Sequence, residues 1–283
     1  IIFDRSVRIS THDPAALYFD DFLKLGEGLP RQSEVEQLYA QANNDDLCNI
    51  LYTSGTTGES KGVMLTYGQY EAALKANDEV VPLKESDRVI QFLPITHIFE
   101  RGWSYLAFSE GCHIIINTNP HDIQQSMRET HPTCMSSVPR FWEKVYQAVL
   151  DKIDRSSVAK QRLFRHALEV GRRYNIDCKS RCKRPSPLLA MEYKLFDKMI
   201  LRLVRKQIGL ENAHLCPTAG ATVSPAVERF VHSVGINMIV GYGLTESLAT
   251  VSCDREDMPF TIGSVGRPIN GLQVKIGDND EIL

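Results

Sequence analysis

Long apolar runs are missing from this sequence of 283 residues: no stretch approaches the roughly 18–20 apolar residues of a membrane-spanning helix. No secretory signal peptide is visible, and the seven cysteines are odd in number and show no regular framework of spacings. This usage predicts reduced thiols and a cytoplasmic location. Cys178 and Cys182 are the only close pair, and no histidine stands at ligand spacing beside them, so no zinc site is expected there.

An excess of one charge sign is also missing, because the formal net charge is only −3. The charges are unevenly distributed, however: residues 152–206 carry 16 Lys and Arg against 5 Asp and Glu, a local balance of +11. With 43% hydrophobic and 24% charged residues, the composition is typical of a globular protein with ample material for a core. The basic segment contains no motif that reads nucleic acid, so nucleic acid is not expected as a partner.

A loop rich in hydroxyls and glycine follows the first apolar run. Residues 52–62 contain five Ser or Thr hydroxyls, three glycines and Lys61, directly after Ile50 and Leu51. Hydroxyls and bare backbone N–H groups bind polyphosphates, glycine permits close approach of the backbone, and an ammonium group offsets the negative charge. A flexible linker is the alternative, but linkers seldom join one apolar run directly to another, and 63–65 is a second run. The sequence therefore predicts a phosphate-binding loop.

This loop differs from that of the P-loop NTPases, which has glycine before the lysine, Ser or Thr after it, and a helix immediately downstream. Here Ser60 precedes Lys61, and Gly62 follows it. The next residues have an extended pattern, and a helix is expected only after Thr66, which forms a capping-box pattern with Gln69. The P-loop NTPase fold is therefore not expected.

Short apolar runs alternate with helical patterns along the chain, which predicts an α/β fold of layered, largely parallel sheets with flanking helices. The runs expected to form strands are 50–52, 89–93, 113–116, 133–138, 214–219 and 236–242. Apolar residues spaced three or four apart predict helices over 141–153 and 195–204, with both apolar faces toward the core. Ser224 and Pro225 mark the start of another helix, and 274–283 has the pattern of a hairpin.

A second motif, Gly241 to Glu246, follows the apolar run 236–240. It therefore stands at the carboxyl end of a predicted strand, which is where open α/β sheets place ligands. The Glu246 carboxylate and the Thr245 hydroxyl are oxygen donors suited to Mg²⁺, which binds such donors together with nucleotide phosphates. On its own, a Gly-Tyr-Gly segment with a nearby glutamate is a turn in most proteins, so the motif gains its meaning from the phosphate-binding loop before it.

Together these segments resemble the adenylate-forming superfamily of acyl-CoA synthetases, luciferases and peptide-synthetase adenylation domains. Residues 52–62 match its pattern Tyr-Thr-Ser-Gly-Thr-Thr-Gly-x-Pro-Lys-Gly except at Ser60, where the family has proline. Residues 241–246 are similar to its Tyr-Gly-x-Thr-Glu element, and 218–221 resembles its adenine loop, with Ala219 replacing the first glycine. The resemblance implies that residues 1–283 form part of the large AMP-binding domain, without the small C-terminal domain.

The resemblance also implies ATP, Mg²⁺ and coenzyme A as cofactors or co-substrates, and it gives each motif residue a role. Catalytic roles fall on Lys61, Thr245 and Glu246, with Glu246 as the Mg²⁺ ligand. The residues implied to hold the nucleotide are Thr53, Ser54, Gly55, Thr56, Thr57, Gly58, Lys61, Gly220, Ala221, Tyr242, Gly243 and Thr245. On the acyl-substrate side the resemblance implies His97 and Gly241. The alternatives are a plain turn at 218–221, a structural role for His97, and, for Trp103, either the core or the wall of an acyl tunnel.

Residues 138–146, followed by 152–206 as a basic helical insertion, resemble the long-chain fatty acyl-CoA synthetases. The implied reaction activates a long-chain fatty acid with ATP to acyl-AMP and then forms acyl-CoA. A basic surface attracts anionic headgroups, so 152–206 is also expected to contact the membrane peripherally, with a solvated helix pair as the alternative. Two other functions stay open: a fatty acyl-AMP ligase that loads a carrier protein, and a non-catalytic nucleotide- or acyl-binding module.

Two further features of the sequence suggest a piece of a longer protein. The chain opens on Ile1 without an initiator methionine, and the family's ribose-binding aspartate, hinge and catalytic lysine of the C-terminal domain are not found before Leu283. We therefore expect these 283 residues to be inactive on their own.

Overall fold

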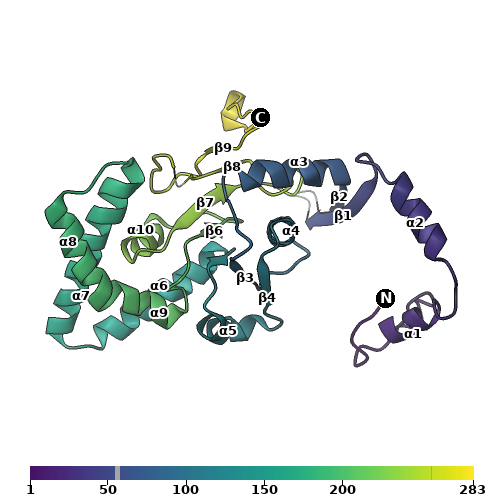
Figure 1. Ribbon diagram of the computed structural model, residues 1–283, viewed down its shortest axis with the longest axis horizontal. Helices are drawn as coiled ribbons and strands as arrows, with labels where there is room; N and C mark the ends of the chain where they lie inside the picture. Colours follow the sequence, from purple (N-terminus) through teal and green to yellow (C-terminus); the bar gives the residue numbers. More distant parts are fainter. Residues whose placement is uncertain (55–57, 256) are drawn as a thin grey trace. The chain divides into compact units, whose positions relative to one another are not determined.

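The computed structural model describes residues 1–54, 58–255 and 257–283, which fall into two compact units (Figure 1). The first unit, Ile1–Asp46, contains helices α1 (Phe19–Lys24) and α2 (Gln32–Gln41). None of its side chains is buried, so the unit has no core of its own. The second unit, Leu47–Leu283, contains strands β1 to β9 and all the motifs singled out in the sequence.

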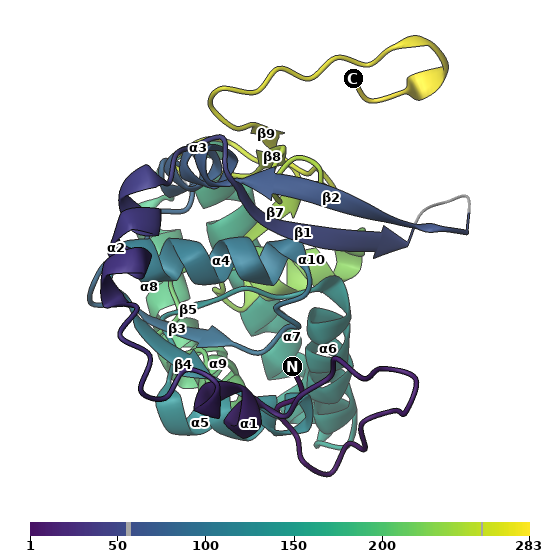
Figure 2. The same ribbon diagram turned by 90° about the vertical axis from the view of Figure 1, so that its right-hand side faces the viewer.

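The predicted phosphate-binding loop connects the two strands of an antiparallel hairpin, β1 (Leu47–Ser54) and β2 (Ser60–Thr66). Helix α3 (Tyr67–Asp78) follows at once, and Figure 2 shows it beside the hairpin. Its first turn is closed by the predicted capping box: Gln69 N donates to Thr66 Oγ1 at 3.3 Å, and Thr66 N donates to Gln69 Oε1 at 2.8 Å. The two apolar runs and the start of the helix are thereby confirmed.

The central strands are parallel, as predicted. Strands β3 (Arg88–Gln91), β4 (His113–Ile116) and β5 (Cys134–Met135) pair in the order β4-β3-β5, and β6 (Cys216–Thr218) pairs in parallel with β7 (Met238–Tyr242). The short strands β8 (Ser252–Cys253) and β9 (Arg267–Pro268) extend this second sheet in antiparallel fashion. The carboxyl ends of β3, β5, β6 and β7 therefore point the same way.

The junction between the two sheets is made partly by side chains. The chain around β5 meets the chain around β6 at the bridges Cys134 to Leu215 and Ser137 to Thr218. Backbone hydrogen bonds accompany these bridges, from Met135 N to the Leu215 carbonyl at 3.2 Å and from Ser137 N to the Pro217 carbonyl at 2.9 Å. The Ser137 and Thr218 hydroxyls lie 2.9 Å apart, and Trp142 Nε1 donates to both, at 2.7 Å and 2.9 Å respectively. All three of these side chains are buried. Hydrogen bonds between side chains thus reinforce the backbone hydrogen bonds at this junction.

Helices cover both faces of these strands. They are α4 (Ile98–Ser109), α5 (Ile123–Thr130), α6 (Pro139–Asp154), α7 (Val158–Arg172), α8 (Pro187–Phe196), α9 (Arg202–Ile208) and α10 (Pro225–Ser233), with the short segments η1 (Pro120–Asp122), η2 (Arg173–Cys178), η3 (Lys179–Arg181), η4 (Asp197–Leu201) and η5 (Asp278–Asp280). Helices α6 to α10 gather at the left of Figure 1, and α3 and α4 lie on the opposite side of β3 and β7.

Alternate residues of the strands face the two helix layers, as the period of an extended chain requires. Ile90, Met135 and Met238 belong to the larger core, with Trp142 of α6. Their neighbours Val89, Cys134 and Ile239 belong to a second core, with Trp103 of α4. Burial on both faces explains why the strands read as continuous apolar runs, and it confirms the predicted α/β class.

The prediction for 195–204 is wrong in part. Phe196, Ile200 and Val204 pack against the larger core as expected. Leu195, Met199 and Leu203, however, are 54%, 50% and 53% exposed. The segment is a continuous run of α8, η4 and α9 that carries two apolar rows, and only one of them has a partner in the described unit. Helical spacing identifies both rows without distinguishing which one faces the core.

The helix predicted over 141–153 is confirmed as α6, and Ser224 stands at the N-cap position of α10 with Pro225 as its first residue. The hairpin expected at the end of the chain is present as a bridge between Ile276 and Ile282. No helix formed by the described residues combines the length and the hydropathy that crossing a bilayer requires.

Candidate active site

A cavity of about 730 Å³ opens at the carboxyl ends of the parallel strands. Its wall includes Val138 after β5 and His97 after β3. It also includes Ala219 and Gly220, which follow β6, and residues 241–246, which begin at the end of β7. This is the edge at which open α/β sheets place their ligands. The topology therefore brings together motifs that lie far apart in the sequence.

The hairpin contributes two polar side chains to this cavity. Thr53 and Lys61 stand directly opposite each other in the β1–β2 register, and both line the cavity. Ser54 pairs with Ser60 at the end of the hairpin. Of the remaining predicted nucleotide contacts, residues 55–57 lie outside the described residues. Gly58 is exposed at the hairpin tip, with φ of +91°, and is not part of the described cavity wall.

The 241–246 motif forms the end of β7 and a tight turn after it. Gly241, Tyr242, Gly243, Thr245 and Glu246 all line the cavity, and the Glu246 side chain is exposed. The turn is held by Ala249 N, which donates to the Leu244 carbonyl at 3.1 Å, and by Ser247 Oγ, which accepts from Leu244 N at 3.0 Å. A carboxylate and a hydroxyl thus belong to the wall of the same cavity that Lys61 lines.

Gly243 is required by a close approach of backbone to backbone. A Cβ at this position would lie 1.1 Å from the Ala249 carbonyl oxygen and 2.3 Å from its carbon. These atoms are backbone and cannot move aside by rotating a side chain. Glycine at 243 therefore allows the turn to fold back on the strand and to aim Thr245 and Glu246 into the cavity.

Only part of the predicted adenine loop, 218–221, lines the cavity. Ala219 and Gly220 line the cavity, and Gly220 has φ of +92°, a left-handed conformation that glycine adopts without strain. Ala221 is exposed and is not part of the described wall. An adenine contact through Gly220 fits this geometry better than one through Ala221.

The predicted acyl-substrate residues stand at the start of helix α4. His97 occupies the N-cap position, is exposed, makes no side-chain cap bond, and lines the cavity. Trp103, two turns later, is only 5% exposed and belongs to a core cluster as well as to the cavity wall. Trp103 is therefore a core residue that also forms part of the cavity wall, and its indole N–H has no partner among the described residues. A role in an acyl tunnel stays a prediction.

Glu100 is a buried acid in the cavity wall that sequence reasoning missed. It is 2% exposed; its carboxylate accepts from Phe92 N at 3.1 Å and from Ser136 Oγ at 2.8 Å. Burial raises the pKa of Glu100 to about 7, although these bonds favour the ionised form. The carboxylate ties the loop after β3 to the end of β5, so it positions the segment that carries His97. The available signal was that Glu100 is the only acidic residue of a helix rich in apolar and aromatic residues.

The rest of the wall is mainly apolar. Leu74 and Val81 from the α3 side, Leu106 from α4, and Ile239 from β7 line it, and Tyr70 and Asn77 of α3 add polar groups that sequence reasoning also missed. One cavity thus combines a polar rim, formed by the hairpin and the 241–246 turn, with an apolar interior. Such a combination suits a ligand with a charged head and a hydrocarbon part.

Known proteins share this sequence pattern. A family model described as AMP-binding enzyme matches residues 6–282. Long-chain-fatty-acid–CoA ligase ACSBG2 of Xenopus laevis is 29% identical over 278 residues, covering 94% of this chain and 36% of that ligase. Long-chain-fatty-acid–[acyl-carrier-protein] ligase AEE15, chloroplastic, of Arabidopsis thaliana is 28% identical over 259 residues, covering 83% of this chain and 35% of that ligase. This chain therefore spans little more than a third of the length of these relatives.

The fold has solved counterparts. The O-succinylbenzoate coenzyme A synthetase MenE of Bacillus subtilis, in complex with ATP and magnesium ion, matches with a TM-score of 0.56 at 16% identity, covering 85% of this chain and 39% of that one. At such identity the likeness establishes the fold alone, which is that of the large domain of adenylate-forming enzymes. Because the family model matches nearly the whole chain and the cavity unites the family's motifs, the protein belongs to the AMP-binding enzyme family of adenylate-forming ligases.

Proposed function

We propose that this protein activates a long-chain fatty acid with ATP to form acyl-AMP and then acyl-CoA. The observation that carries the proposal is that one cavity has both polar and apolar walls. Its polar residues include Lys61, Thr245 and Glu246, and its apolar residues include Leu74, Val81, Leu106 and Ile239. The charged rim suits the phosphates, and the apolar interior suits a hydrocarbon chain. The similarity to a long-chain-fatty-acid–CoA ligase supports the same substrate class.

In the proposed first step, an oxygen of the fatty carboxylate attacks the α-phosphorus of ATP. A P–O bond to the acyl group forms, the bond to the bridging oxygen breaks, and pyrophosphate leaves with the electron pair. Negative charge develops on the phosphoryl oxygens, so catalysis rests on positioning and electrostatic stabilisation. Thr53 and Lys61, opposite each other in the hairpin, would hold the β- and γ-phosphates. No side-chain nucleophile is needed.

Glu246 and Thr245 fit a Mg²⁺ site because both offer oxygen donors on the cavity wall, and Glu246 is exposed enough to reach a hydrated ion. A bound Mg²⁺ would neutralise phosphate charge and orient the leaving pyrophosphate. Tyr242, Gly243 and Gly220 line the same cavity and would contact the adenosine part. His97 and Gly241 would lie on the acyl side, and Glu100 would fix the loop that carries His97.

In the proposed second step, the thiol of coenzyme A attacks the acyl carbonyl of acyl-AMP, and AMP leaves. A carrier protein is the alternative acceptor of the acyl group, and the similarity to an acyl-carrier-protein ligase supports it. A non-catalytic binding module is less well supported, because Lys61, Thr245 and Glu246 are all present on the cavity wall. We further propose that 1–283 is part of the AMP-binding domain and that 152–206 is a basic helical insertion within it.

Acid-dependent exchange between ATP and pyrophosphate tests the function in the full-length protein, using saturated acids from acetate to palmitate. We expect the exchange rate to rise with chain length, because each methylene buried in the apolar interior adds about 0.8 kcal/mol. A maximum at short or aromatic acids would retain adenylation and reject the fatty-acid substrate. Binding of MgATP without exchange for any acid would favour the binding module.

The exposed apolar row supports a peripheral contact with an anionic membrane. Leu188, Met191, Leu195, Met199 and Leu203 recur every three or four residues along α8, η4 and α9, and they are 71%, 66%, 54%, 50% and 53% exposed. Lys194, Lys198 and Arg202 are exposed between them. An apolar row flanked by cations is the arrangement by which a helix lies in a membrane interface.

The charges beside this row are partly available for lipid headgroups. In the basic segment, Arg172 pairs with Glu169 and Asp177, and Arg205 pairs with Asp197, so these cations are already neutralised. Lys194, Lys198 and Arg202 are therefore the better candidates, at about 1 kcal/mol for each cation held near an anionic surface. Such a contact would bring the enzyme to the bilayer in which its proposed substrate dissolves.

Vesicle sedimentation tests this contact. We expect more full-length protein to sediment with anionic vesicles than with neutral ones, and the double variant Leu195→Gln, Met199→Gln to lower this partition by at least about tenfold, or about 1.4 kcal/mol. The control variant Ile116→Gln removes an apolar side chain that is 70% exposed on β4, and it should leave the partition unchanged. Equal partition to neutral and anionic vesicles would contradict the proposal.

A further inference from the structure

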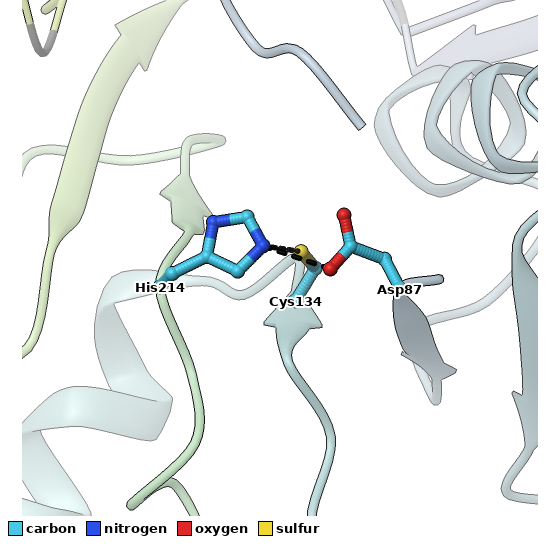
Figure 3. A group of neighbouring side chains, drawn as sticks. All are labelled: Asp87, Cys134 and His214. Carbon is cyan, nitrogen blue, oxygen red and sulfur yellow. Dashed lines mark hydrogen bonds and ion pairs between the residues drawn. The ribbon is translucent and has the colours of Figure 1, made fainter. Parts of the chain in front are cut away.

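Three side chains with metal-binding atoms meet at the opposite end of the sheet from the cavity. Asp87 immediately precedes β3, Cys134 is the first residue of β5, and His214 lies two residues before β6 (Figure 3). These positions are the amino ends of the same strands whose carboxyl ends carry the proposed active site. The proposed adenylation chemistry uses none of the three.

The donor atoms converge on one point. His214 Nε2 lies 2.8 Å from Asp87 Oδ1 and 3.3 Å from Cys134 Sγ, and the three donors lie within 4.8 Å of one another. Figure 3 shows the imidazole, the thiol and the carboxylate pointing toward one another. Among the described residues this is the one group of three or more His, Cys, Asp or Glu with this property.

The arrangement is not that of a catalytic triad. A triad needs the carboxylate on one imidazole nitrogen and the nucleophile on the other, so that a proton passes through the ring. Here the thiol and the carboxylate both contact Nε2 of His214. Two partners that share one ring nitrogen cannot pass a proton through the ring, so the group is not a proton relay of this kind.

The supporting contacts hold the donors in place. Asp87 Oδ1 accepts from Thr133 Oγ1 at 2.7 Å, and Asp87 Oδ2 accepts from Lys84 N at 2.9 Å. The Thr133 hydroxyl also accepts from Arg88 N at 2.9 Å, which fixes its own orientation. Bonds of this kind to a ligating carboxylate are what metal sites use to orient their first ligands.

Burial gives the group a closed side and an open side. Asp87 is 4% exposed and Cys134 is fully buried, whereas the His214 side chain is 45% exposed. The imidazole therefore forms the solvent-facing side of the group, and an ion would enter from that side.

We propose that Asp87, Cys134 and His214 form a site for a divalent transition metal ion of the zinc class, with water as the fourth ligand. Tetrahedral zinc at about 2.0–2.3 Å from its ligands places these atoms about 3.3–3.6 Å from one another. The spacing between His214 and Cys134 already meets this value, and the spacing between His214 and Asp87 would open by about half an ångström. A soft thiolate selects such ions over Mg²⁺.

Binding would fasten three strand starts to one another. The backbone already links the same places, since Thr133 N donates to the Arg88 carbonyl and His214 N donates to the Thr133 carbonyl, both at 2.9 Å. A metal ion at this edge would add a side-chain clamp to these links. The inference stands independently of the proposed substrate, because it concerns a different end of the fold.

Titration with Co²⁺ tests the site in untagged, chelator-treated full-length protein. We expect about one Co²⁺ per chain to produce a near-ultraviolet thiolate-to-cobalt band together with the strong visible bands of tetrahedral cobalt. Added Zn²⁺ should remove both, and Zn²⁺ should raise the melting temperature of the protein. A Thr133→Ala variant should bind about 10- to 100-fold more weakly, because the supporting bond to Asp87 is lost.

Substitutions of the proposed metal ligands test whether these side chains bind the metal. Cys134→Ser should abolish the charge-transfer band, and His214→Asn should abolish tetrahedral binding; because His214 is half-exposed, this second variant should still fold. The matched control is Cys216→Ser, which alters a fully buried thiol on the neighbouring strand and should keep the wild-type spectrum. The proposal is wrong if folded wild-type protein shows no thiolate-to-cobalt band, or if the band persists in both donor variants. Asp87 and His214 would then form a simple ion pair.

Discussion

A Glu246→Gln variant is expected to exchange ATP and pyrophosphate about 100- to 1,000-fold more slowly than the wild-type protein, a loss typical of removing one preorganised group that stabilises the transition state. Gln keeps the shape of the side chain and removes the negative charge that the proposed Mg²⁺ contact needs. Glu246 lines the cavity and is exposed, so the substitution should leave the melting temperature nearly unchanged. The measurement is the exchange rate at saturating acid, taken over a range of Mg²⁺ concentrations.

The Mg²⁺ dependence separates a role in the site from a general defect. If Glu246 holds the ion, the variant should need more Mg²⁺ for half-maximal exchange as well as having a lower maximal rate. Glu85→Gln is the matched control, because it neutralises another exposed acid that lies away from the cavity wall. Exchange by Glu246→Gln within about threefold of wild type, at every Mg²⁺ concentration, would remove Glu246 from the proposed mechanism.

Gly243→Ala is expected to destabilise the protein by about 3 kcal/mol or more and to abolish detectable nucleotide binding. The added methyl group would meet the Ala249 carbonyl at 1.1 Å, so the turn must move away from β7 and take Thr245 and Glu246 with it. Most point substitutions cost about 0.5–3 kcal/mol, so this change should stand at the upper end of that range. Denaturant unfolding and a nucleotide-binding titration measure the two effects.

Gly102→Ala is the matched control for this variant. A Cβ at position 102 would lie 3.8 Å from the Cβ of the same neighbour, Ala249, which is an ordinary contact. Because Gly102 lies inside helix α4, alanine there should stabilise the helix by up to about 1 kcal/mol. If Gly243→Ala and Gly102→Ala were equally stable, the crowding at position 243 would not govern the turn.

Local chemistry explains what the sequence could predict. The two apolar runs that flank the predicted phosphate-binding loop, the capping box of Thr66 and Gln69, and the strand at 113–116 depend on neighbours in the chain, and the structure has them where they were expected. The phosphate-binding role of the loop stays a prediction. The strand expected over 133–138 is shorter: β5 ends at Met135, where its pairing with β3 ends, and beyond it only the bridge and backbone bonds of Ser137 to the β6 segment continue. Pattern alone marks apolar residues, whereas a ladder requires a partner strand in register.

The periodicity of the sequence could not decide which of the two apolar rows on α8, η4 and α9 is exposed. Residues three and four apart share one helix face, but a helix with two apolar rows satisfies the same rule twice. Only the packing of α8 and η4 against α7, and of α9 against α5, selects Phe196, Ile200 and Val204 as the core row. The direction in which Leu195 and Met199 face is therefore a property of the tertiary structure.

Much of the candidate site was predictable because the family's motifs are contiguous in sequence. Thr53, Lys61, His97, Thr245 and Glu246 all line one cavity, although their roles there stay predictions. Glu100 was missed because its significance comes from Phe92 and Ser136, and the second of these is 36 residues away. Cys134 and His214 are 80 residues apart, and Asp87 and His214 are 127 apart, so no spacing rule could have joined the three.

The junction between β5 and β6 has an evolutionary consequence. Trp142, Ser137 and Thr218 satisfy one another's polar atoms in a place that water does not reach. Loss of any one partner would leave the other two with one hydrogen bond fewer, a cost of about 1 kcal/mol for each bond lost. We therefore expect relatives that replace Trp142 to differ at Ser137 and Thr218 as well. Ser137 and Trp142 lie five residues apart and Thr218 lies 76 residues beyond Trp142, so this expected co-variation joins two distant segments of the chain.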